Sequence, residues 1–206
     1  MAVTSEDDPT PLVLILANTV RRAMAAKPKL AAGVRGVGAV CSVADAQAVT
    51  LRIDRGNVHL SHGRAADAGV VITLDLAKDG LPDAPKPKVE GAVRHLRLAL
   101  ALGKLLDPPL PPWQEAAEEF WHRSSERPHM PTRLRVRDDS GAELTVGDGS
   151  GRAFEIRGPA DRLARVFVGA AFMLEEAQAG RVYARGTMAE SMAMTSAGLD
   201  LAMARS

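Results

Sequence analysis

The segment Arg181-Val182-Tyr183-Ala184-Arg185-Gly186 decides the fold, because it is a degenerate copy of Lys86-Pro87-Lys88-Val89-Glu90-Gly91. In both segments a basic residue comes first and a glycine comes last. Short strands precede each segment, and a strongly apolar stretch with helical spacing follows it, at residues 93–106 and 187–203. Self-similarity of this kind is a sign of duplicated units. The sequence therefore predicts the same structural unit twice.

The first half begins with a predicted helix and continues with predicted strands. Thr10 and Pro11 suit a helix start, because threonine is a good N-cap and proline is favoured in the first turn. The apolar residues that follow predict a helix over residues 12–26. Brief turns then separate segments that predict an antiparallel meander, at residues 37–43, 49–54, 57–62 and 70–74. Two prolines in residues 85–91 indicate an edge strand, which the helix over 93–106 follows.

The second half repeats this order after a proline-rich connector at residues 108–112. A helix is predicted from Trp113, with strands at residues 132–137, 143–146 and 153–156. A long amphipathic helix is predicted from Pro159 to Gly180, because one apolar stripe runs through it and glycine commonly ends a helix. A short strand at residues 181–185 leads into the last helix, at residues 187–203.

These elements predict an α+β fold in which amphipathic helices cover an antiparallel β-sheet, with internal duplication. The expected organisation is a flexible tail (1–9), a first unit (10–107), the connector (108–112) and a second unit (113–206). The sequence leaves open whether the two units form one compact body.

The charge balance, the cysteine content and the distribution of apolar residues exclude several classes of function. The chain has 206 residues, and its 26 basic residues are balanced by 25 acidic ones, so a nucleic-acid partner is not expected. Cys41 is the only cysteine, which excludes an intrachain disulfide and fits a reducing compartment. The first nine residues are polar and acidic, unlike a secretory signal, and no apolar run approaches the length of about 20 residues that spans a bilayer. We expect a soluble, cytoplasmic protein.

Residues 180–186, together with the Met-rich segment that follows, resemble the sterol carrier protein family, whose small domains bind sterols, fatty acids and acyl chains. Residues 153–156 and the helix from Pro159 are similar to that family's strand and middle helix. In the first half, residues 49–76 and 85–106 are similar to its central hairpin, last strands and last helix. The resemblance implies a sterol-carrier-like fold with an apolar cavity between sheet and helices.

Each copy departs from the family pattern. About nine residues after Leu76 are too few for the middle helix in the first unit, and the second unit is short of its first strand. The two halves are therefore expected to complete one another across a shared or adjoining sheet, with the cavity in the second half.

The expected cavity wall comes from two helices of the second half. Methionine suits such a wall because its flexible thioether adapts to guests of different shape. The candidate ligand-binding residues are Leu163, Val166, Phe167 and Leu174, facing Met188, Met192, Leu199 and Met203. The other interpretation is that both stripes pack on the sheet as ordinary core.

Arginines near the expected cavity are candidates for contacting an anionic headgroup. Guanidinium groups pair well with carboxylate or phosphate, so Arg181 and Arg185 are assigned this role. A strand face with Arg133, Arg135 and Arg137 is either a further anion contact or simply a solvated face.

Signals for an enzyme are weak. His59 and His62 lie on opposite faces of one predicted strand, which is poor geometry for a metal. The glycine-rich residues 33–38 follow a helix, whereas a dinucleotide loop follows a strand. We therefore expect no catalytic residue, metal or cofactor.

The expected function is non-catalytic binding and transport of a fatty acid, sterol, phospholipid or other apolar molecule, with transient membrane or protein contact left open. The alternative is a protein–protein interaction module without a cavity, whose partner surface would contain the rare aromatic residues Trp113, Phe120 and Trp121.

Overall fold

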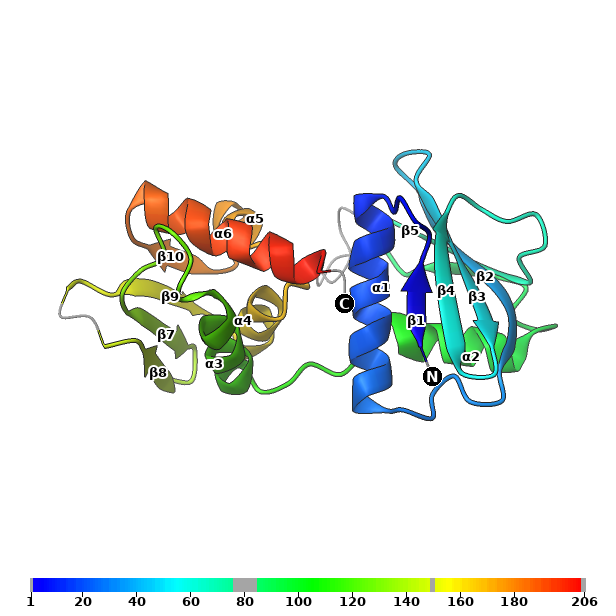
Figure 1. Cartoon of the computed structure of the whole chain (residues 1–206), viewed down its shortest axis with the longest axis horizontal. Helices are drawn as coiled ribbons and strands as arrows, with labels where there is room; N and C mark the ends of the chain where they lie inside the picture. Colours follow the sequence, from blue (N-terminus) through cyan, green and yellow to red (C-terminus); the bar gives the residue numbers. More distant parts are fainter. Residues whose placement is uncertain (1, 76–84, 149–150, 205–206) are drawn as a thin grey trace. The chain divides into compact units, whose positions relative to one another are not determined.

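The structure, a computed structural model, describes residues 2–75, 85–148 and 151–204 (Figure 1). The chain divides into two units inside the proline-rich connector. The first unit ends at Pro109 and the second begins at Leu110. Both units combine helices with a mixed β-sheet, so the α+β class is confirmed.

The first unit is a six-stranded sheet that shares one hydrophobic core with two helices. Its elements are β1 (Val3–Ser5), α1 (Pro11–Ala26), β2 (Arg35–Ser42), β3 (Ala48–Asp54), β4 (Asn57–His62), β5 (Val70–Leu74), β6 (Lys88–Glu90) and α2 (Leu96–Leu106). The strand order is β1-β4-β3-β2-β5-β6, which places β6 at an edge as its prolines predicted. Thr10 caps α1 by accepting a hydrogen bond from the amide of Val13.

The start of the chain is part of this sheet. Residues 1–9 were expected to form a flexible tail, but β1 pairs with β4, with Val3 opposite Val58. The Thr4 hydroxyl also lies 3.0 Å from Nδ1 of His59. The prediction is wrong for Val3–Ser5 because the edge of β4 offers unpaired backbone groups that a short extended segment can satisfy.

The sheet is mixed and not antiparallel as predicted. β2, β3 and β4 form the antiparallel meander, but β5 pairs with β2 in parallel, and so does β1 with β4. The connection after β4 crosses the sheet, and Thr50 holds it by donating to the carbonyl of Gly63 at 2.6 Å and accepting from the amide of Ala65 at 2.9 Å. β5 therefore reaches the free edge of β2 and runs parallel to that strand.

The second unit packs its helices on a four-stranded sheet of order β10-β9-β7-β8. Its elements are α3 (Trp113–Ser124), β7 (Leu134–Asp138), β8 (Glu143–Val146), β9 (Phe154–Gly158), α4 (Ala160–Phe167), α5 (Met173–Gln178), β10 (Tyr183–Arg185) and α6 (Met188–Ala202). β7 pairs in parallel with β9, so this sheet is mixed too.

The strands of the two units follow the same order. The hexapeptide alignment places Lys88–Glu90 on Tyr183–Arg185, and these residues are the edge strands β6 and β10. The register then matches across four strands. The row Val49-Val40-Ile72-Val89 of the first sheet corresponds to Leu144-Val136-Ile156-Ala184 of the second. The sequence repeat thus coincides with a repeat of strand order.

The two units do not complete one another in a shared sheet, because each has its own. In the residues that the structure describes, the second unit has no counterpart of β1 or β4, because no strand precedes β7 there and β8 is followed by β9. The strand expected to be missing, the counterpart of β2, is present as β7. The segment expected to lack the middle helix of the first unit, residues 76–84, lies outside the described residues.

The predicted helix from Pro159 to Gly180 is two helices, α4 and α5. Gly169 interrupts it with a φ of +71°, in the left-handed region that favours glycine. A Cβ at this position would lie 3.0 Å from the amide nitrogen of Ala202 and 3.1 Å from the carbonyl oxygen of Gly198, both in α6. The backbone of α6 therefore packs closely against Gly169, where the predicted helix is interrupted. The apolar stripe in the sequence continues through this position and gave no sign of the interruption.

Candidate functional site

Three of the predicted cavity residues belong to the core of the second unit. Leu163, Val166 and Phe167 are at most 4% exposed. The Phe167 ring meets the Phe120 ring edge-on, with 5.5 Å between their centroids. These contacts match the interpretation of the α4 stripe as core.

The predicted face of α6 points away from that core. Met188 is 76% exposed, Met192 55% and Leu199 37%, while Met203 is partly exposed. The buried residues of α6 are instead Met194, Ala197, Gly198 and Ala202. The apolar residues of α6 are spread around the helix between its polar ones, so their periodicity did not select a face. The buried face is instead the one with the small residues Gly198 and Ala202, because they let α6 approach the turn at Gly169 closely. Leu174, on α5 beyond that turn, is also 37% exposed.

The predicted headgroup residues have different environments. Arg181 donates from Nε and a terminal nitrogen to both oxygens of the buried Glu176, at 2.8 and 2.9 Å. Arg162, which is also buried, has a terminal nitrogen 4.0 Å from the same carboxylate. The Arg181 guanidinium is therefore engaged inside the unit, whereas Arg185 is exposed on β10.

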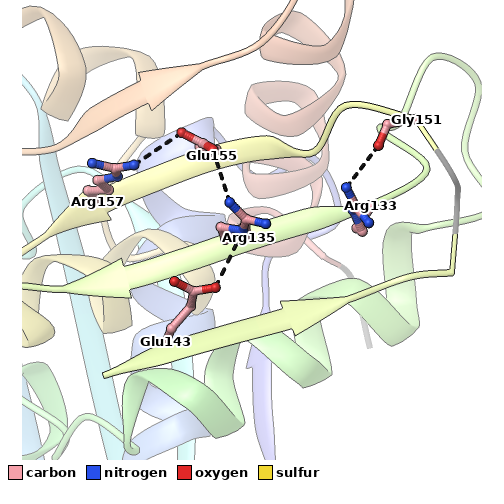
Figure 2. Close-up of polar contacts among 6 residues, drawn as sticks. All are labelled: Arg133, Arg135, Glu143, Gly151, Glu155 and Arg157. Carbon is pink, nitrogen blue, oxygen red and sulfur yellow. Dashed lines mark hydrogen bonds and ion pairs between the residues drawn. The ribbon is translucent and has the colours of Figure 1, made fainter. Parts of the chain in front are cut away.

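The arginines of β7 lie on the sheet face opposite the helices, because they alternate with buried Leu134 and Val136. Figure 2 shows that this face also contains carboxylates. Arg135 lies 3.4 Å from both Glu143 and Glu155, and Arg157 lies 3.4 Å from Glu155. Arg133 donates to the carbonyl of Gly151 at 2.9 Å, and Arg137 is exposed. Much of this arginine face is therefore neutralised, as a solvated face would be.

A pocket of about 890 Å³ lies in the first unit, between the α1–β2 connection and α2. It was not predicted from the sequence. Its walls combine aliphatic residues with the polar ends of basic ones, namely Lys27, Pro28, Lys29, Leu30, Ala32, Gly33, Val34, Arg97, Leu100, Ala101 and Lys104. The pocket therefore offers apolar surface and positive charge together.

Every charged side chain that lines this pocket is basic. Lys27 and Lys29 come from one side, and Arg97 and Lys104 from α2 on the other. In the part of the chain that the structure describes, none of these four takes part in an ion pair. The whole chain has a formal net charge of only +1, so this is a local concentration of unneutralised charge.

Two glycines of β2 position the α2 wall. A Cβ on Gly36 would lie 2.8 Å from a methyl of Leu98, and one on Gly38 would lie 2.4 Å from a methyl of Leu102. The glycines of residues 33–38 therefore serve helix packing. With Leu98 and Leu102 turned to the sheet, Arg97, Leu100 and Lys104 lie on the other side of α2, at helical spacing. The sequence analysis missed two signals of this pocket, namely the helical spacing of Arg97, Leu100 and Lys104 and the pair Lys27 and Lys29.

The aromatic surface of the alternative function is largely buried. Trp113 and Phe120 are each 3% exposed, and only Trp121 is partly exposed. The Trp113 indole donates to Oδ2 of Asp138 at 2.9 Å, which joins the start of α3 to the end of β7. The two buried rings are core residues and do not form a partner surface.

Searches over the described residues add two observations. No three His, Cys, Asp or Glu side chains gather there in a way that could hold a metal ion. None of the helices in those residues is both long and apolar enough to cross a bilayer. Comparison of the chain with protein-family models, with curated proteins and with solved structures finds no significant match.

Proposed function

We propose that the protein is a non-catalytic carrier that binds a single-chain anionic amphiphile, such as a fatty acid, in the pocket of the first unit. The observation that supports this is the set of four cations around an apolar surface, none of which has an ion pair among the described residues. The resemblance to the sterol carrier family favours the same class of ligand. The site differs from the one expected from the sequence, because the methionine face of α6 is exposed to solvent.

The two parts of such a ligand have different tasks. Burying the chain against Leu30, Val34 and Leu100 contributes up to about 0.8 kcal/mol per methylene, which is roughly a fourfold gain in affinity. The headgroup meets exposed cations, where each ion pair is worth about 1 kcal/mol or less and is screened by salt. Affinity should therefore follow chain length most strongly, and charge should select the headgroup.

Displacement of a fluorescent fatty acid tests this proposal. Decanoate, dodecanoate and tetradecanoate should compete with increasing affinity, and dodecanol should compete more weakly than dodecanoate. The variant K27E/K29E should weaken dodecanoate binding by about tenfold, equal to 1.4 kcal/mol. The matched control is R55E/K86E, which reverses two exposed cations of the same unit that do not line the pocket and have no ion pair among the described residues. Absence of saturable binding, or affinities independent of chain length, contradicts the proposal.

The second candidate function is protein–protein interaction. Its partner surface would be the exposed side of α6, because the aromatic residues expected to form that surface are largely buried. Met188, Met192 and Leu199 present a flexible apolar surface, and such surfaces are frequent at protein interfaces. The simplest partner is a second copy of the chain. Sedimentation velocity should then detect self-association that M188D/M192D abolishes, whereas a monomer at all concentrations speaks against this role.

A further inference from the structure

The segment that ends the first unit exposes large aliphatic side chains. Val93 is 96% exposed, Leu96 61% and Leu100 56%. Leu96 and Leu100 are four residues apart and so lie on one side of α2, while Val93 belongs to the turn that leads into the helix. The opposite side of α2 is in the core, through Leu98, Leu102 and Leu105. The exposed residues Val93, Leu96 and Leu100 therefore do not contribute to the hydrophobic core of the first unit.

Basic side chains flank this apolar surface. Arg94, Arg97 and Lys104 belong to the same segment and are exposed, and residues 91–106 contain no Asp or Glu. None of the three has an ion pair among the described residues. Lys27 and Lys29 add positive charge from the other rim of the pocket. We call Val93, Leu96 and Leu100, with Arg94, Arg97 and Lys104, the α2 face.

We propose that the α2 face docks on the surface of an anionic phospholipid bilayer. A helix that lies in the plane of a membrane inserts its apolar side at the headgroup boundary and keeps its basic residues near anionic lipids. The α2 face has this arrangement, and its charge is complementary to such a membrane. With 11 residues, α2 is too short to span the bilayer.

Docking and the pocket share three residues, Arg97, Leu100 and Lys104. A docked first unit would therefore hold the mouth of the pocket beside the membrane, so that an acyl chain could pass between them. This transfer step rests on the proposed function. Docking also uses Val93, Arg94 and Leu96, which do not line the pocket, so it can be tested separately from ligand binding.

Vesicle co-sedimentation of the full chain tests the proposal. We expect binding to vesicles of phosphatidylcholine and phosphatidylglycerol in equal parts, and at least tenfold weaker binding to phosphatidylcholine alone. Raising the ionic strength from about 0.1 M to about 1 M shortens the Debye length from about 10 Å to about 3 Å, and should release much of the bound protein.

The decisive variant is V93D/L96D, because both positions are exposed and lie outside the pocket lining. It should lose vesicle binding at least tenfold while keeping its circular dichroism spectrum and its affinity for monomeric dodecanoate. The control, M188D/M192D, introduces the same two charges at two exposed apolar side chains of α6, and should bind vesicles like the parent.

Each other outcome has a distinct meaning. Vesicle binding that V93D/L96D leaves unchanged, or that does not depend on anionic lipid, overturns the docking proposal. Failure to bind either vesicle, with saturable binding of an acidic amphipathic peptide, also overturns it and assigns the face to a protein partner. Loss of fatty-acid binding in the parent with intact vesicle binding contradicts the proposed function alone.

Discussion

Arg181 and Glu176 form a bidentate ion pair in the second unit, with Nε and a terminal nitrogen of Arg181 at 2.8 and 2.9 Å from the two carboxylate oxygens of Glu176. Glu176 lies on α5 and is 4% exposed. Arg162 of α4, 6% exposed, lies 4.0 Å from the same carboxylate. One carboxylate thus serves two guanidinium groups and connects α4 and α5 to the segment before β10. An arginine predicted to bind a headgroup has a structural role.

Removing the shared carboxylate should destabilise the second unit. In E176A, Arg181 can turn to solvent, but among the described residues the buried Arg162 keeps only its ion pair with the exposed carboxylate of Asp161, at 3.8 Å, so the unit should lose about 1.5–3 kcal/mol. Both tryptophans of the chain, Trp113 and Trp121, lie in this unit, so urea unfolding followed by tryptophan fluorescence reports on it directly.

The control for this measurement is E119A, which removes an exposed ion pair with Arg123. Exposed pairs contribute about 1 kcal/mol or less, so E119A should unfold close to the parent. Equal unfolding free energies for E176A and E119A would show that the Glu176 cluster does not stabilise the fold.

Gly169 should tolerate alanine far less well than Gly180. Both have a positive φ, of +71° and +68°, so alanine costs about 1–2 kcal/mol of left-handed strain at either position. A Cβ on Gly180 meets nothing within 4 Å, whereas one on Gly169 meets the α6 backbone at 3.0 Å. G169A should therefore lose about 1–3 kcal/mol more than G180A in the same unfolding assay. Equal losses would contradict close packing of α6 on this turn.

Acid should weaken the second unit through Asp138. Hydrogen bonds from the Ser140 hydroxyl, the Trp113 indole and nearby backbone amides hold the pKa of this carboxyl below its ordinary value of 3.8. A lowered pKa in the folded state means that the stabilisation is complete above that ordinary value and is lost as the pH falls through the folded value. D138N should remove this part of the acid dependence, giving a shallower fall of the unfolding free energy below about pH 4. A profile identical to the parent's would exclude Asp138 as a contributor.

Limited oxidation with hydrogen peroxide checks the orientation of α6. Met188 and Met192 are exposed, while Met194 on the same helix is 2% exposed. Methionine oxidation follows exposure, so peptide mass spectrometry should find sulfoxide at Met188 and Met192 at least about tenfold faster than at Met194. Faster oxidation of Met194 would mean that the methionine face predicted from the sequence is the buried one.

Local chemistry made most of the secondary structure predictable. Thr10 and Pro11 mark the start of α1, and the alternation in residues 49–54 and 57–62 identifies β3 and β4. The two aligned hexapeptides contain the short strands β6 and β10, and the prolines of residues 85–91 indicated that the first of these is an edge strand. The first strand was missed, since three residues are too short to show a period.

The sequence by itself thus determined the α+β class, the repeat along the chain of short strands followed by an apolar helix, and the balance of charge. Only the tertiary structure decided which strand pairs with which, where the long helix breaks at Gly169, and which face of α6 is buried. It also brought Lys27 and Lys29 to the same pocket as Arg97 and Lys104. The physical reason is that local signals depend on neighbours along the chain, whereas burial and charge proximity depend on how closely distant segments can approach.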